Sequence, residues 1–127
     1  MIDIIEDFPD NIVAVSCRGH VTRRDYERVL IPTVEARLKK HDKIRLFYRV
    51  GPEFDRIDPG AVLEDIGVGF SHLTRWERIA LVTDIEWMRL AIRAFAFLLP
   101  CPVGFFSASQ EPEAREWIVG REPKKGA

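Results

Sequence analysis

Few residues in this sequence combine the types and the spacing that catalysis or metal binding needs. Cys17 and His20 stand three positions apart, which could suit one metal ion, yet no second pair of ligands accompanies them. Asp65 and His72 stand seven positions apart and would share one face of a helix, where they could act as acid and base or simply be solvated side chains. No serine lies in a GxSxG-type turn. The sequence therefore predicts no catalytic residue, no metal site, no cofactor and a protein that is not an enzyme.

The most unusual segment is an apolar helix expected between residues 85 and 99, after a buried strand at 78–84 and before a proline. On a wheel of about 100° per residue, Glu86, Arg89 and Arg93 fall within about 60°, while apolar side chains fill about 200° of the rest. A helix on a protein surface usually needs an apolar stripe of only about 100°. We expect the side opposite the arginines to dock on the sheet, namely Trp87, Met88, Ala91, Phe95 and Leu98.

This assignment leaves an apolar flank that is formed by Leu90, Ala94 and Phe97. Two hypotheses fit it: a neighbouring helix covers the flank as part of the core, or the flank is a site for lipid or for a partner. Under the second hypothesis the flank enters an apolar ligand or a bilayer. Arg89 and Arg93, which we expect to point away from the sheet, would then meet phosphate or carboxylate head groups. These five residues are predicted to bind the ligand.

The preceding helix is expected to run from Asp58, which can cap it ahead of a proline, to His72. Phe70 belongs to its apolar stripe and completes the predicted ligand-binding set. Gly67 and Gly69 each cost about 1 kcal/mol relative to alanine within a helix, which indicates a bend or the close approach of another backbone. We therefore predict that the two helices form a gate, with Gly67 and Gly69 as its weak point.

Length and composition exclude several classes of protein. The 127 residues suit one domain, and 19 basic against 20 acidic side chains give a formal charge of −1, so no overall field attracts nucleic acid. The two cysteines, Cys17 and Cys101, are too few for a disulfide framework and fit a reducing cytoplasm. The first residues are acidic where a signal peptide is basic, and no apolar run approaches the ~20 residues that span a bilayer. We expect a cytoplasmic protein, at most peripheral to the inner face of the membrane.

Hydrophobic periodicity and turn residues predict the other elements. Strands at 2–7 and 12–18 should pair as an antiparallel hairpin, and a helix at 23–40, capped by Thr22 and Asp25, should kink at Pro32. A strand at 43–50 should end at Gly51-Pro52, before a loop at 53–57. The strand at 78–84 should be a central strand. The last strand is expected at 103–106 and the last helix at 111–119.

The resulting order, ββαβαβαβα, predicts an α/β fold in which helices connect parallel strands. We expect a single domain over residues 1–120, with a mostly parallel five-stranded sheet and about four helices. Residues 121–127 are polar and are predicted to be a disordered tail.

Three segments carry a resemblance to a known family: residues 65–72 (DIGVGFSH), 76–84 (WERIALVTD) and 113–118 (EAREWI). Gly19 and Asp25-Tyr26 extend the match over nearly the whole chain. The sequence thus resembles the SpoIIAA-like family of small bacterial proteins, which is similar to STAS domains and is compared with the lipid-binding CRAL-TRIO domain. The resemblance implies a βα superhelix, an open and a closed form, and a role at membranes or with an apolar ligand.

One departure from the STAS regulators affects the predicted function. Anti-sigma-factor antagonists carry a phosphorylatable serine or threonine at the start of the helix after the third strand, whereas residues 51–60, GPEFDRIDPG, contain no hydroxyl side chain. A phosphorylation switch at that site is therefore chemically excluded. We predict a noncatalytic module that binds a lipid-like apolar ligand or a membrane surface. The alternative is a regulatory protein-interaction module of the STAS type that acts as a homodimer.

Overall fold

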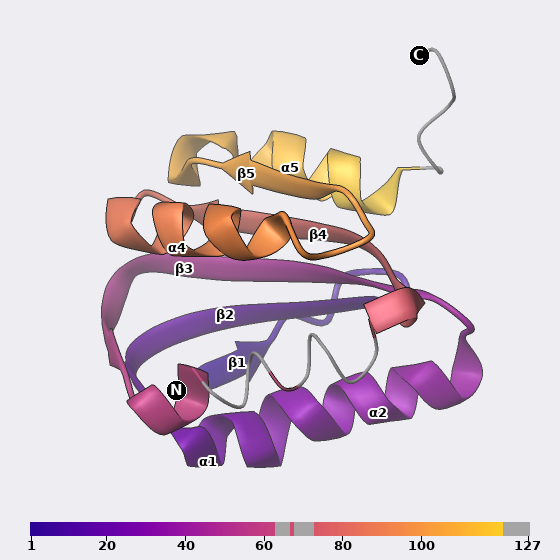
Figure 1. Cartoon of the computed structure of the whole chain (residues 1–127), viewed down its shortest axis with the longest axis horizontal. Coiled ribbons are helices and arrows are strands. Elements are labelled where there is room, and N and C mark those ends of the chain that lie inside the picture. Colours follow the sequence, from indigo (N-terminus) through magenta and orange to yellow (C-terminus); the bar gives the residue numbers. More distant parts are fainter. Residues whose placement is uncertain (63–66, 68–72, 121–127) are drawn as a thin grey trace.

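A five-stranded sheet forms the centre of the structure, a computed structural model that describes residues 1–62, 67 and 73–120 (Figure 1). The strands lie in the sheet in sequence order: β1 (Ile2–Ile4), β2 (Ile12–Val21), β3 (Ile44–Ile57), β4 (Trp76–Thr83) and β5 (Val103–Phe106). β1 is antiparallel to β2, and every later pair is parallel. The predicted α/β class and mostly parallel five-stranded sheet are confirmed. The middle strand is β3 rather than β4, although β4 also has a neighbour on each side.

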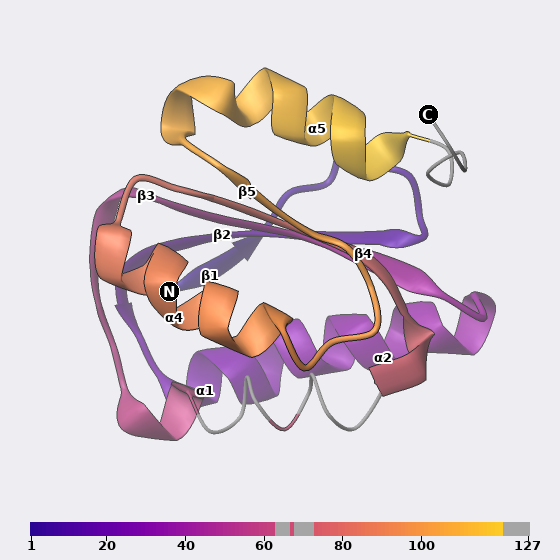
Figure 2. The ribbon, with the colours of Figure 1, turned by 45° about the horizontal axis from the view of Figure 1, so that its top comes forward.

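Helices cover both faces of this sheet (Figure 2). The helical segments with assigned bounds are α1 (Arg23–Asp25), the π-helical η1 (Tyr26–Leu30), α2 (Ile31–Lys40), η2 (Leu73–Arg75), α4 (Glu86–Ala96), η3 (Ala108–Gln110) and α5 (Glu111–Val119). α1, α2 and α4 lie on one face and α5 on the other. Because side chains alternate along a strand, Val13 and Val15 of β2 join the core under α2, while Ile12 and Ala14 join the core under α5.

The first helical region begins as predicted and contains a π-helical segment in its middle. Thr22 accepts a hydrogen bond from the Asp25 amide, and the Asp25 carboxylate accepts one from the Thr22 amide at 2.8 Å, which is a complete capping box. Just before Pro32, the chain widens into η1, where the Ile31 amide donates to the carbonyl of Tyr26, five residues earlier. This widening accommodates Pro32, which has no N–H for the carbonyl four residues before it.

β3 is longer than predicted, because β2 supports its second half. The sequence predicted an end at Val50 and a loop after Gly51-Pro52. Instead, Cys17 pairs with Val50 and Gly19 pairs with Phe54, so β3 advances four positions where β2 advances two. This bulge accommodates the missing N–H of Pro52, and Gly19 takes a φ of 58°, which glycine adopts without strain. The predicted strand end and loop are therefore wrong.

Several other boundaries differ by a few residues from those predicted. β1 ends at Ile4 instead of residue 7, β2 continues to Val21, β4 begins at Trp76, and α4 ends at Ala96 instead of residue 99. The bounds of β5 and α5 agree with the prediction. Within the predicted helix at 58–72, residues 59–62 and 67 are helical. Residues 63–66 and 68–72 and the predicted tail at 121–127 lie outside the described residues.

Two buried arginines fasten the C-terminal end of α5 to the sheet. Ile118 is fully buried and Trp117 packs against the same core, so both residues anchor α5. Arg45, 5% exposed, pairs with Glu77 at 2.7 Å and donates to the Ile118 carbonyl at 2.7 Å. Arg78 donates to the Trp117 carbonyl and stacks on its ring. Helix carbonyls at the negative end of the helix dipole thus stabilise two adjacent cations.

Candidate functional site

The position of α4 on the sheet decides which of its side chains reach solvent. The Thr83 hydroxyl accepts a hydrogen bond from the Ile85 amide at 3.1 Å just before the helix begins. Met88 is 6% exposed, and Ile85 and Ile92 are partly buried against the same core. These three positions recur at helical spacing, so they define the face of α4 that packs on the sheet.

This face differs from the predicted one by a rotation of about 80° around the helix axis. Of the side chains expected to dock, Met88 is buried, whereas Trp87 is 55% exposed, Leu98 is 54% exposed and Ala91 is exposed. The side chain of Phe95 lies outside the described parts of the structure. The predicted docking face is therefore wrong for three of its five positions.

The arginines explain the rotation, because they turn towards the sheet instead of away from it. Arg89 donates from Nη1 to the carbonyl of Thr83, the last residue of β4, at 3.0 Å. The Arg93 guanidinium lies over the ring of Phe105 on β5, 5.0 Å from its centroid. Arginine stems can cover apolar surface while the charged group stays near water, so cations need not mark the outer face of a helix.

The result is an exposed apolar surface, which we call the α4 stripe. On α4 it consists of Trp87, Leu90, Ala91 and Ala94, which lie within an arc of about 100°. Phe97 and Leu98, in the turn that follows α4, are exposed as well and complete the stripe. Leu90 is 62% exposed and Phe97 is 88% exposed, so the predicted flank is open to solvent, and no helix among the described residues covers it. Its role as a binding site stays a prediction. Trp87 and Leu98 also belong to the α4 stripe, although the helical spacing predicted that they would pack on the sheet.

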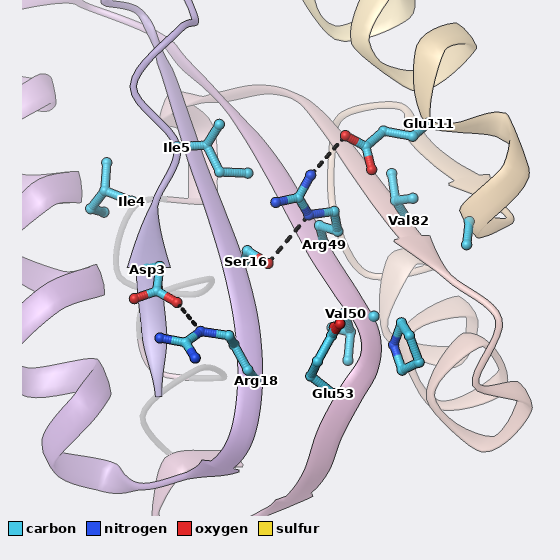
Figure 3. A pocket seen from close by; sticks show the side chains of 13 residues that line it. Asp3, Ile4, Ile5, Ser16, Arg18, Arg49, Val50, Glu53, Val82 and Glu111 are labelled. Atoms are coloured by element: carbon cyan, nitrogen blue, oxygen red, sulfur yellow. Dashed lines mark hydrogen bonds and ion pairs between the residues drawn. The ribbon is translucent and has the colours of Figure 1, made fainter.

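A second feature is an open groove of about 710 Å³ on the other face of the sheet, beside the N-terminus of α5 (Figure 3). Its polar lining consists of Asp3, Ser16, Arg18, Arg49, Glu53 and Glu111. Sequence reasoning assigned none of these side chains to a site. The alternation of side chains along a strand could have indicated this groove. Asp3 pairs with Ser16 across β1 and β2, and Arg18 follows Ser16 by two residues on the same face of the sheet.

Both arginines that line this groove are paired with a carboxylate. Arg18 donates from Nε to Asp3 at 2.6 Å, and this bond raises the pKa of the Arg18 guanidinium. Arg49 donates to Glu111 at 2.7 Å and to the Ser16 hydroxyl at 3.2 Å (Figure 3). An external anion would have to replace an existing ion pair, so the groove is a weaker candidate than the α4 stripe.

The other predicted candidates do not converge on a site. Cys17 is buried, while the His20 imidazole lies 2.5 Å from the Asp58 carboxylate. Among the described residues, no group of three or more histidine, cysteine or acidic side chains could hold a metal ion. Burial raises the pKa of the Cys101 thiol, which makes its reactive thiolate scarce.

The predicted gate falls largely on residues that the structure does not describe. Gly69, Phe70, Asp65 and His72 all lie outside the described residues. Gly67 is helical and exposed, and a Cβ added there would meet no atom within 4 Å. The close approach of another backbone, one of the two reasons offered for the glycines, is therefore wrong at Gly67.

The comparisons with known proteins agree with this architecture. No curated protein matches the chain. A crystal structure at 2.25 Å resolution of an uncharacterized protein of the DUF3478 family from Shewanella loihica PV-4, described as having a SpoIIAA-like fold, superimposes with a TM-score of 0.68. The two chains are 22% identical over 92% of this chain and 93% of that one, which shows a shared fold. The SpoIIAA-like family model matches residues 12–119, and the chain therefore belongs to the SpoIIAA-like family.

Proposed function

We propose that this protein is a noncatalytic module that binds a lipid-like apolar ligand or a membrane surface through the α4 stripe. The observation that carries the proposal is the exposure of four large apolar side chains on α4 and in the turn after it: Trp87, Leu90, Phe97 and Leu98 are 54% to 88% exposed. Contiguous apolar surface of this extent is uncommon on a monomer and marks contact with lipid or protein. No helix in the described parts of the chain is long and apolar enough to cross a bilayer, so the proposed contact is peripheral.

The energy available from the stripe sets the strength of this contact. Burial of a large apolar side chain contributes about 1.5 to 3 kcal/mol, so these four, weighted by their exposed fractions, contribute about 4 to 8 kcal/mol. This corresponds to about three to six decades of affinity before ordering costs are subtracted. Binding should therefore be weak to moderate and reversible.

The arginines contribute less to the proposed contact than the sequence suggested. Arg89 is already bonded to the Thr83 carbonyl, so its removal should lower stability as well as binding. Arg93 is exposed, and among the described residues its contact is the ring of Phe105, so it can also meet a phosphate or carboxylate head group. The preference for anionic lipid should thus depend mainly on Arg93. The gate at Gly67 and Gly69 stays part of the proposal.

A regulatory protein-interaction role is the second candidate function. Membership of the SpoIIAA-like family supports that role, and the structure adds one observation in its favour. The rim of the stripe carries the exposed Glu86 on the same side of α4 as Arg93, whereas a helix that lies on an anionic bilayer is usually rich in cations along its polar face.

Flotation with lipid vesicles tests the proposal. We expect the protein to float with vesicles of phosphatidylcholine and phosphatidylglycerol and Phe97→Asp to remain unbound. Val119→Asp is the matched control, because Val119 is an apolar side chain, 48% exposed, on α5 at the opposite face of the sheet. Arg93→Ala should reduce the difference between anionic and neutral vesicles. Equal flotation of Phe97→Asp and Val119→Asp, with both folded by circular dichroism, would refute a role for the stripe.

A further inference from the structure

The polar groove beside the N-terminus of α5 has the size of a small-molecule site. Its volume is about 710 Å³, and such sites usually occupy roughly 300 to 1,000 Å³. It lies at the bulge between β2 and β3 and close to the carboxyl end of β4, since Val82 and Glu111 also line it (Figure 3). Bulges are common beside functional sites, and ligands of open α/β sheets bind near the carboxyl ends of the parallel strands. The groove is therefore placed where this kind of fold usually binds a ligand.

Two hydrogen-bond donors converge in this groove from adjacent strands. Ser16 pairs with Arg49 across β2 and β3, and Arg49 donates from Nε to the Ser16 hydroxyl oxygen at 3.2 Å. The hydroxyl group can still donate its own proton. Among the described residues, the Nη2 group of Arg49 has no hydrogen-bond partner. A planar guanidinium beside a hydroxyl donor suits a carboxylate, so this pair forms an anion subsite.

The ion pair that holds Arg49 can be exchanged at little cost. Glu111 accepts hydrogen bonds from Arg49 at 2.7 Å and from Arg115, on its own helix, at 3.0 Å. Its carboxylate therefore keeps a cation when Arg49 turns to a ligand. Ion pairs that are partly exposed, as these are, contribute little to stability. Exchange of Glu111 for a ligand carboxylate thus leaves no charge without a partner.

The other charges disfavour a ligand that is only an anion. Three carboxylates line the groove, Asp3, Glu53 and Glu111, against two arginines, Arg18 and Arg49, so the formal charge of the lining is two minus three, or −1. Asp3 is paired with Arg18 at 2.6 Å, whereas Glu53 has no ion pair among the described residues. The pKa of the Arg18 guanidinium is raised mainly by Asp3 and further by the charge of Glu53, which places Glu53 near the basic side chains. A ligand that brings a cation with its carboxylate would satisfy Glu53 as well.

We propose that this groove binds a small zwitterion, a molecule with one carboxylate and one ammonium group, such as an amino acid. Its carboxylate bonds to the Arg49 guanidinium and the Ser16 hydroxyl, and its ammonium group pairs with Glu53. The charges involved are partly exposed, so the Kd should be high, about 1 to 10 mM, and should rise with the salt concentration. The groove and the α4 stripe lie on opposite faces of the sheet, so this site is independent of the proposed function (Figure 2).

Nuclear magnetic resonance titration at constant ionic strength tests the class of ligand. Glycine, γ-aminobutyrate and ε-aminocaproate place the two charges at increasing separations, whereas butyrate and butylamine carry one charge each. At least one zwitterion should bind with a Kd at least about fivefold lower than that of either singly charged compound. The largest shifts are expected at the amides of Ser16 and Gly51, which line the groove. Butyrate or butylamine binding as tightly as the best zwitterion would overturn the proposal, as would shifts confined to other residues.

Substitutions in the groove test the assigned roles. Arg49→Gln should raise the Kd of the best zwitterion at least about fivefold. Arg37→Gln is the matched control, because Arg37 is also an ion-paired arginine, 25% exposed against 31% for Arg49, and lies on α2 at the opposite face of the sheet. Ser16→Ala keeps the ion pair of Arg49 and gives a second variant should Arg49→Gln fail to fold. Glu53→Gln should remove the preference for the zwitterion over butyrate. Unchanged binding in Ser16→Ala or in a folded Arg49→Gln, or an unchanged preference in Glu53→Gln, would overturn the assignment.

Discussion

Truncation of Met88 on α4 and of Phe97 in the turn after it separates the core-facing side of this region from its exposed side. Phe97 is 88% exposed, so about 12% of its surface is covered, and Phe97→Ala removes only about 0.3 kcal/mol of burial energy. Met88 is 6% exposed, and Met88→Ala removes nearly its whole burial energy and leaves a cavity. Such changes cost about 2 to 5 kcal/mol. The larger side chain should therefore contribute the smaller share of stability.

Urea unfolding followed by far-ultraviolet circular dichroism measures this difference. The free energy of unfolding should fall by less than about 0.5 kcal/mol for Phe97→Ala, with an unchanged m-value. A loss above about 1 kcal/mol would show that Phe97 belongs to the core, which would refute the argument for an exposed stripe.

Four further changes test other parts of the structure. Thr22→Ala should lower the free energy of unfolding by about 1 kcal/mol, because it removes the capping oxygen of α1. Burial on its own raises the pKa of Asp25, but hydrogen bonds from Thr22 lower it below its usual value overall. Asp25 therefore stabilises the fold above its unfolded-state pKa, and this contribution should disappear as the pH falls through the lower folded-state pKa. Acid titration of the unfolding midpoint should show this loss in the protein and not in Asp25→Asn. Arg45→Ala should cost about 3 to 5 kcal/mol in urea unfolding, because Glu77 loses its buried partner, whereas a cost below about 1 kcal/mol would contradict its role in holding α5. Gly67→Ala should raise thermal stability by about 0.4 to 1 kcal/mol, since Gly67 is helical with open space around it, and a lower melting temperature would contradict that placement.

Short-range signals were sufficient where neighbours along the chain supply the interactions. The capping box of Thr22 and Asp25 formed as expected because both hydrogen bonds join residues three positions apart. α5 matched its predicted bounds for the same reason: Pro112 suits its first turn, and Gly120 follows its last residue. The alternation of helices and strands was likewise enough to predict the α/β class.

Non-local pairing decided the length of β3. A Gly-Pro pair ends most strands when considered alone, but here β2 continues alongside and supplies partners as far as Ile57. The hydrogen bonds that extend β3 join residues more than 30 positions apart, so local propensity contains no information about them.

The tertiary structure also decided the candidate site. The sequence established that α4 has more apolar surface than one docking face needs, and that Glu86, Arg89 and Arg93 share one side. It could not establish the rotation of the helix, because that depends on the Thr83 carbonyl and the Phe105 ring, which receive the two arginines. Both partners belong to other elements. The amount of apolar surface is a property of composition and spacing, whereas the side of the helix that faces water is a property of its packing on β4 and β5.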